Sequence, residues 1–185
     1  GRSGDVDGMS FSILQPGKIL FGRGQAAEAA GIAASFGRRV ALVHGRDAGR
    51  AEWLRQDLLR VGMEVRAISC GQEPTLAMLE AAVEDARGVD LVISLGGGAV
   101  IDLGKAAAAL VPAPGGAMDH LEVVGKGMPL SVPPLPFIAL PTTAGTGAEV
   151  TKNAVIDVPA HRRKVSLRDD RMIARAAIVD PALTD

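Results

Sequence analysis

The stretch Ser94-Leu-Gly-Gly-Gly-Ala-Val-Ile-Asp-Leu-Gly-Lys-Ala106 decides the fold of this chain. Its three consecutive glycines follow the apolar run 89–95 and open an alanine-rich segment of helical character. Glycine lets the backbone approach a ligand without an intervening Cβ, and a helix N-terminus offers an anion free N–H groups and the positive end of the helix dipole. The order of strand, glycine loop and helix therefore predicts a phosphate-binding turn, with Asp102 in the first helical turn.

The same stretch has a purely structural interpretation. A glycine-rich turn lets a helix pack closely on a strand, and Asp102 is then an ordinary N-terminal helix charge. The loop also lacks the full dinucleotide fingerprint. Taken alone, it leaves both interpretations open.

A second motif, Phe137-Ile-Ala-Leu-Pro-Thr-Thr-Ala-Gly-Thr-Gly-Ala-Glu-Val-Thr151, favours the ligand site. Here too a short apolar strand ends in a loop of small and hydroxyl residues. Threonine hydroxyls both donate and accept hydrogen bonds, which suits ribose and adenine edges. By itself this motif is also explained by an ordinary Thr/Gly turn.

The rest of the chain predicts an α/β fold. Strands are expected at 40–43, 63–69 and 89–95, and helices at 24–36, 51–61, 75–86 and 99–110, with Thr75 as a helix cap. This alternation predicts a Rossmann-like parallel sheet with flanking helices, in which ligands bind at the carboxyl ends of strands. Both motifs lie at such ends, so they are expected to share one site.

The remaining segments predict shorter β elements around this sheet. Residues 11–21 are expected to form two short strands, and 111–136 an irregular excursion over the surface. The pieces 154–157 and 164–167 are expected to pair as a hairpin with its turn at 157–161, followed by a last strand at 177–180.

Composition limits the function classes. The chain has 185 residues, 48% hydrophobic and 22% charged, with a net charge of −1, which gives no electrostatic case for nucleic acid or an acidic membrane. Cys70 is the single cysteine, so no internal disulfide forms, and it is interpreted as a small residue at a strand end. No apolar run reaches membrane-spanning length, and a cytoplasmic location is expected.

Together these residues resemble the amino-terminal domain of the iron-containing (group III) alcohol dehydrogenases. The resemblance rests on Gly22, on Gly96-Gly-Gly-Ala-Val-Ile-Asp102, on Pro141-Thr-Thr-Ala-Gly-Thr-Gly-Ala-Glu-Val-Thr151 and on Ile178-Val-Asp-Pro-Ala-Leu-Thr184. The Pro-Thr-Thr-Ala-Gly-Thr-Gly run is specific to this family. The glycine triplet is shared with its relatives, the glycerol dehydrogenases and dehydroquinate synthases.

The resemblance implies a dehydroquinate synthase-like amino-terminal domain with an edge β-hairpin, and hydride transfer between an alcohol and its aldehyde or ketone with NAD(P). Residues 1–10 are interpreted as a leader or cloning scar and 11–185 as the nucleotide-binding domain. In the family a second, helical domain holds iron or zinc through an Asp and several His. That domain is expected to be absent from this chain, and the chain alone is expected to lack turnover.

The resemblance also implies individual roles. Gly97, Gly98, Ala99 and Asp102 are expected at the pyrophosphate and nicotinamide, four threonines at the adenosine and ribose, and Lys164 and Val179 near the nicotinamide ribose. The expected cofactor-binding residues are Gly45, Arg46, Gly96, Gly97, Gly98, Ala99, Asp102, Thr142, Thr143, Thr146, Thr151, Lys164 and Val179. No metal ligand is expected, because His44, His120 and His161 do not match the family's ligand positions and are interpreted as surface or strand-end residues.

Two departures from the family bear on the cofactor. NAD-preferring members resemble one another in an Asp that bonds the adenosine ribose, where this chain has His44-Gly45-Arg46. A glycine leaves room for a 2′-phosphate and an arginine can pair with it, which favours NADP, although Arg46 is equally explained as a solvated turn residue. Glu73-Pro74 also replaces the common Asn-Pro, which leaves an adenosine-side contact open.

Two other function classes stay open. One is a stand-alone nucleotide-binding or interaction domain without chemistry of its own. The other is an enzyme resembling glycerol dehydrogenase or dehydroquinate synthase. The expected partners are a nicotinamide dinucleotide and a small alcohol or carbonyl compound, with no nucleic acid and no membrane, and a homodimer stays open.

Overall fold

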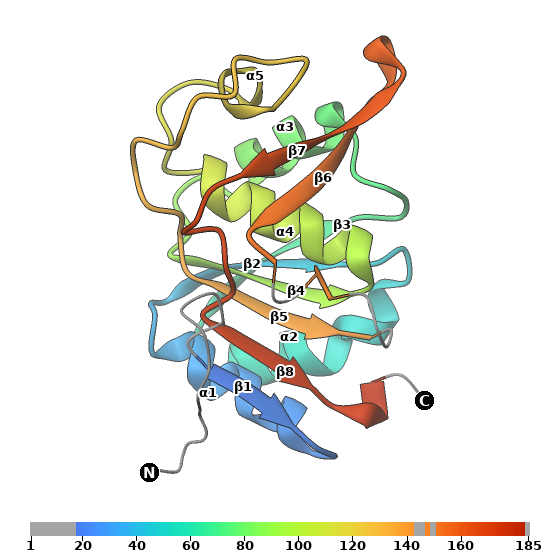
Figure 1. Cartoon of the computed structure of the whole chain (residues 1–185). Helices are drawn as coiled ribbons and strands as arrows, with labels where there is room; N and C mark the ends of the chain where they lie inside the picture. Colours follow the sequence, from blue (N-terminus) through green and yellow to red (C-terminus); the bar gives the residue numbers. More distant parts are fainter. Residues whose placement is uncertain (1–17, 143–146, 149–150, 184–185) are drawn as a thin grey trace, which may run out of the picture.

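The central element is a six-stranded sheet, in which every neighbouring pair of strands is parallel (Figure 1). The structure is a computed structural model that describes residues 18–142, 147–148 and 151–183. The strand order is β1-β8-β5-β4-β2-β3. The strands are β1 (Lys18–Phe21), β2 (Arg39–His44), β3 (Glu64–Ser69), β4 (Leu91–Gly96), β5 (Phe137–Pro141) and β8 (Ala176–Val179). Strands β2, β4 and β5 are almost wholly buried, as their continuous apolar sequences predict.

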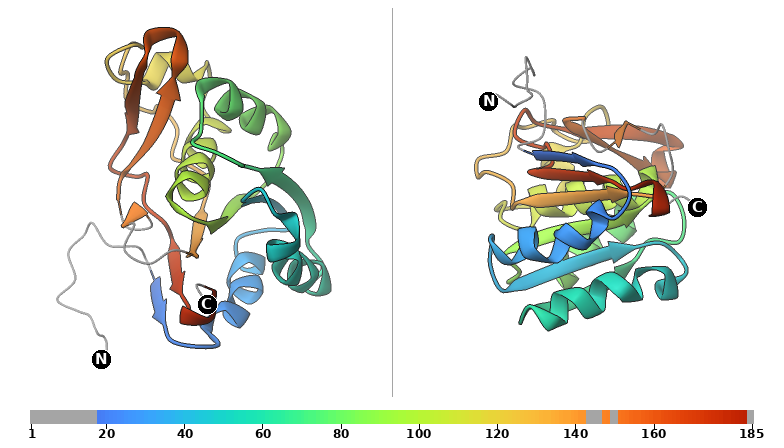
Figure 2. Two further views of the ribbon diagram at one scale, coloured as in Figure 1. Left: turned by 90° about the vertical axis from the view of Figure 1, so that its right-hand side faces the viewer. Right: turned by 90° about the horizontal axis from the view of Figure 1, so that it is seen from below.

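Helices cover both faces of the sheet, and each face has its own hydrophobic core (Figure 2). On one face lie α1 (Ala29–Ala34) and α2 (Glu52–Arg60), each preceded by a short 3-10 helix, Gln25–Glu28 and Ala48–Ala51. On the other face lie α3 (Leu76–Asp85) and α4 (Gly98–Leu110). The short helix α5 (Ala117–His120) belongs to the excursion between α4 and β5.

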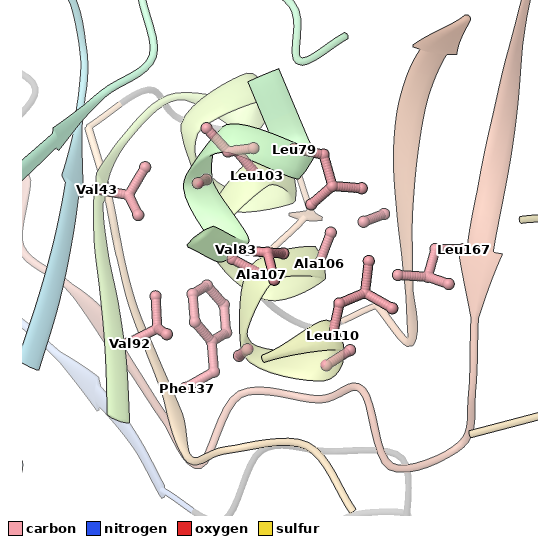
Figure 3. Packing of buried hydrophobic residues seen from close by; sticks show 14 of the residues in the cluster. Val43, Leu79, Val83, Val92, Leu103, Ala106, Ala107, Leu110, Phe137 and Leu167 are labelled. Carbon is pink, nitrogen blue, oxygen red and sulfur yellow. The ribbon is translucent and has the colours of Figure 1, made fainter. Parts of the chain in front are cut away.

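A β-hairpin covers the side of α4 that faces away from the sheet. Its strands β6 (Asn153–Val158) and β7 (Arg163–Arg168) are antiparallel and form a separate two-stranded sheet. Helix α4 therefore lies between two β layers, and ten of its thirteen residues are buried. Figure 3 shows the resulting core, with side chains from the sheet, α3, α4 and β7: Val43, Val92, Phe137, Leu79, Val83, Leu103, Ala106, Ala107, Leu110 and Leu167.

The approach of α4 to the sheet depends on Gly104. A Cβ at this position would lie 1.9 Å from Ser94 Oγ and 3.0 Å from a ring carbon of Phe137. The buried Ser94 hydroxyl donates to the carbonyl oxygen of Val100 at 2.8 Å, so it is fixed on the same helix. Only glycine lets α4 pack this closely on β4 and β5.

The structure confirms the predicted parallel sheet and the hairpin between 154–157 and 164–167. Thr75 caps α3, because its Oγ1 accepts the N–H of Met78 at 3.1 Å. The second strand of 11–21 is β1, while residues 11–17 lie outside the described residues. In the described part of the chain, no helix is long and apolar enough to cross a membrane.

Three local expectations are corrected. Asp102 is the fifth residue of α4 and lies in its second turn rather than its first, because the helix begins at Gly98. The segment 24–36 is divided into a 3-10 helix and α1 instead of forming one helix. His120 is buried rather than exposed, with its Nδ1 2.8 Å from the carbonyl oxygen of Met128.

Candidate nucleotide-binding site

The carboxyl ends of β2, β4 and β5 form one cleft of about 310 Å³. The strand register aligns these ends, since His44 pairs with Leu95 and Gly96 with Pro141. Thr142 continues the alignment, because its N–H donates to the carbonyl oxygen of Gly96 at 2.9 Å. The cleft is lined by His44, Gly45, Arg46, Asp47, Arg50, Ala51, Leu95, Gly96, Gly97, Val100, Thr142 and Leu183.

The glycine loop leads directly into α4, and the residue that caps the helix has an extended rather than a left-handed backbone. Gly97 is the N-cap residue in an extended conformation (φ −82°, ψ −169°), and no described side chain caps it. The first-turn amides of α4 therefore keep their capacity to bind an anion at the floor of the cleft. Packing explains why residue 96 is a glycine, since a Cβ there would lie 2.7 Å from the side chain of Val100.

Two arginines line the end of the cleft that follows β2. The guanidinium of Arg46 donates from Nη2 to the carbonyl oxygen of Gly71 at 2.9 Å. Arg50 lies four residues further, in the 3-10 helix before α2. Asp47 lies between them, and its Oδ1 accepts the N–H of Gly49 at 2.9 Å as the cap of that helix. At Gly45 a Cβ would meet no atom within 4 Å, so the space beside the arginines is open.

Asp102 faces the hairpin. Its Oδ2 accepts the backbone N–H of Val155 in β6 at 3.2 Å. Burial raises the pKa of Asp102 above its usual value, and the Val155 N–H and the charge of Lys105 act in the opposite direction. The carboxylate therefore holds the hairpin on α4 and is not among the groups that line the cleft.

Thr151 and Lys164 also make contacts within the chain. The Thr151 hydroxyl accepts from Lys105 Nζ at 3.0 Å. Lys164, an exposed residue of β7, forms an ion pair with Glu73, with Nζ to Oε1 at 2.8 Å. The hydrogen bond to Glu73 raises the pKa of Lys164. Glu73 thus forms an ion pair with Lys164 that a neutral Asn at this position could not form.

The structure brings Gly45, Arg46, Gly96, Gly97 and Thr142 together in the cleft, as the sequence predicts. Gly98 and Ala99 follow as the first residues of α4. Val179 ends β8 at the same edge of the sheet, half-buried, and Thr143 and Thr146 lie outside the described residues.

Several lining residues were not predicted, among them Asp47, Arg50 and Leu183. The sequence holds a signal for Arg50. The order strand, Gly, Arg46, capping Asp47 predicts a helix start directly after β2, which places residue 50 beside Arg46. Leu183 follows β8 by four residues and reaches the cleft through the short 3-10 helix Pro181–Leu183. The sequence signal for this helix is Asp180 followed by proline, since the Asp180 carboxylate accepts the N–H of Ala182 as a cap.

Cys70 is buried beside the site. Its Sγ lies 3.1 Å from the carbonyl oxygen of Gln72, and burial raises the pKa of its thiol. A raised pKa disfavours the reactive thiolate, which agrees with a structural role. Within the described residues, no group of three or more His, Cys, Asp or Glu side chains is arranged to hold a metal ion.

Comparisons with known proteins agree with this geometry. The chain is 34% identical to the probable alcohol dehydrogenase EutG of Escherichia coli over 177 residues, which are 94% of this chain and 43% of the relative. It is 30% identical to the NAD-dependent methanol dehydrogenase of Bacillus methanolicus, covering 95% of this chain and 46% of the relative. The structure of sulfoacetaldehyde reductase from Bifidobacterium kashiwanohense in complex with NAD+ superposes with a TM-score of 0.82 at 30% identity, covering 96% of this chain and 48% of that protein.

The chain thus spans less than half the length of these relatives. A family model described as iron-containing alcohol dehydrogenase matches residues 16–181. The parallel sheet, the glycine loop at the start of α4 and this match lead to one conclusion: the chain belongs to the iron-containing alcohol dehydrogenase family.

Proposed function

We propose that this chain is the NAD(P)-binding part of a metal-dependent alcohol dehydrogenase that transfers hydride between an alcohol and its aldehyde or ketone. One observation carries the proposal: the cleft joins three parallel strand ends to a helix N-terminus that no described side chain caps. A dinucleotide needs both features, because its pyrophosphate is an anion and its adenosine needs a half-apolar groove. The complex of sulfoacetaldehyde reductase with NAD+ supports the same cofactor class.

In this proposal the residues have separate roles. Gly97, Gly98 and Ala99 bind the pyrophosphate through backbone N–H groups, and Thr142 contacts the adenosine side of the cleft. The roles implied for Asp102, Thr143, Thr146, Thr151, Lys164 and Val179 remain part of the proposal. The iron or zinc ion of the family is assigned to no residue of this chain.

We further propose a preference for NADP over NAD. The open space at Gly45 has room for a 2′-phosphate, and Arg46 and Arg50 line the same end of the cleft. Guanidinium groups bind phosphate through charge-assisted hydrogen bonds. Asp47 carries the opposite charge nearby, but two guanidinium groups outnumber its one carboxylate in this part of the cleft.

The experiment is calorimetric titration of the purified chain with NADP and NAD. The parent chain is expected to bind, and Gly98→Val is expected to lose binding while staying folded by circular dichroism, because its side chain occupies the space of the pyrophosphate. Gly116→Val is the matched control, since a Cβ at this helix-capping glycine meets no atom within 4 Å. Equal binding by Gly98→Val and the parent would show that the glycine loop is only structural.

A further inference from the structure

Lys105 is a fully buried lysine in the middle of α4, with 1% of its surface exposed. Its Nζ lies 2.5 Å from the carbonyl oxygen of Ala148, 2.7 Å from that of Thr151 and 3.2 Å from that of Asn153. The Thr151 hydroxyl accepts from it as well, at 3.0 Å. An ammonium group has three donors and no acceptor, and this ring of oxygens satisfies it. Because an unsatisfied buried amine is costly, these contacts tie residues 148, 151 and 153 to α4.

Asp102 makes the complementary contact one helical turn earlier. It accepts the N–H of Val155, whereas Lys105 donates to the carbonyl of Asn153. Asp157 adds a third contact in the series, since its N–H donates to the carbonyl oxygen of Pro74 at 2.8 Å. Positions 153, 155 and 157 alternate along β6, so these groups share the edge that is not paired with β7. Side chains of α4 and the loop before α3 therefore satisfy a strand edge that would otherwise be open.

The helix that holds this edge is also the helix that begins at the glycine loop. Gly98 and Lys105 lie on one rigid element, which is buried between the sheet and the hairpin. Residues 148, 151 and 153 are thereby fixed relative to the amides at the N-terminus of α4. A binding segment that is already fixed loses less conformational entropy when a ligand arrives.

We propose that Lys105 is a positioning residue for dinucleotide binding: it holds Thr151 and the start of β6 in register with the glycine loop, and does not itself contact the cofactor. The proposal rests on the function proposed above. The buried ammonium group of Lys105 thus preorganises the binding site as well as stabilising the fold.

The test compares Lys105→Met with Lys152→Met. The control removes a lysine from the same segment, one whose Nζ forms an exposed ion pair with Asp170 at 2.9 Å. Calorimetry measures the affinity of each variant for NADP and NAD and for inorganic pyrophosphate, the part of the cofactor that the glycine loop binds in the proposed function. We expect Lys105→Met to weaken dinucleotide binding about tenfold or more and to leave pyrophosphate binding within about twofold, and we expect Lys152→Met to match the parent.

Each outcome decides a different claim. If the parent chain binds neither dinucleotide, the proposed function fails. If the parent binds and Lys105→Met binds dinucleotide equally well, or loses pyrophosphate and dinucleotide binding in parallel, the positioning role is wrong.

Hydrogen exchange of the parent chain gives a second measurement, which holds even where Lys105→Met does not fold. If binding requires the hairpin to be docked on α4, bound NADP must slow exchange at the Val155 amide, which docking buries against Asp102. Unchanged exchange at Val155 with saturating cofactor overturns the proposal.

Discussion

The carboxylate of Asp180 accepts the backbone N–H of Ala26, 154 residues earlier in the chain, at 3.0 Å. It also accepts the N–H groups of Gly24 and Ala182, both at 2.9 Å, and Asp180 is only 3% exposed. These bonds join the turn after β1 to the end of β8. They also lower the pKa of the Asp180 carboxyl, with the Ala26 N–H as the largest cause.

Asp180→Ala is expected to lower the free energy of unfolding at neutral pH by about 3 kcal/mol, because it leaves the buried amide of Ala26 and two part-buried amides without an acceptor. A lowered folded-state pKa stabilises the chain above the ordinary carboxyl pKa, near pH 4, and that stabilisation is lost as pH falls through the folded-state value. Urea unfolding across this range should show the parent and variant converging in acid. A constant difference down to the lowest pH would contradict the role of the carboxylate charge.

Gly104→Ala is expected to destabilise the chain by about 2 kcal/mol, since the new methyl group would collide with Ser94 Oγ. Gly31→Ala in α1 is the matched control. Its added Cβ meets no atom within 4 Å, so alanine should stabilise the helix by up to about 1 kcal/mol. Thermal unfolding of both variants measures the difference, and a Gly104→Ala chain as stable as the parent would refute the packing argument.

Arg46→Ala is expected to weaken NADP binding about tenfold, equivalent to about 1.4 kcal/mol, and to leave NAD binding nearly unchanged. The loss is specific because only NADP carries the 2′-phosphate. Arg60→Ala, which removes an exposed arginine at the end of α2, serves as control. If the variant loses equal affinity for both cofactors, or loses affinity for neither, Arg46 does not bind this phosphate.

The purified 185-residue polypeptide is expected to bind cofactor without oxidising alcohols, even with iron(II) or zinc(II) added. Substrate positioning and metal polarisation of an alkoxide each contribute several kcal/mol to such reactions, and no residue of this chain is assigned to either. Absorbance of the reduced cofactor with a panel of primary and secondary alcohols measures turnover. Metal-dependent formation of reduced cofactor would disprove this prediction.

The sequence predicts the central strands of the sheet well because they are continuous apolar runs. The segment 40–43 lies in β2 and residues 91–95 of the segment 89–95 lie in β4, and both strands are buried from both faces. The cleft follows from the same reasoning, since glycine and threonine loops at carboxyl ends must meet in a parallel sheet.

The contacts that the sequence did not reveal are long-range ones. Lys105 bonds to carbonyl oxygens more than forty residues away, and Asp180 bonds to amides at the other end of the chain. The sequence does not mark the residues that Lys105 and Asp180 bind, because the bonds are made to backbone groups, which are the same at every position. Asp102 was placed one turn too early because the helix begins at the last of the three glycines, a boundary that local pattern does not fix.

Dinucleotide binding in the cleft at the carboxyl ends of β2, β4 and β5 is tested by an NMR titration of the isotope-labelled chain with NADP, in which backbone amide shifts are followed. We expect saturable shifts concentrated at Gly45 and Arg46, at 96–99 and at Thr142. A second cavity, lined by Ile32, Phe36 and Arg175, lies between α1 and the start of β8. Shifts concentrated at that cavity, or no saturable shifts at all, would contradict binding in the cleft.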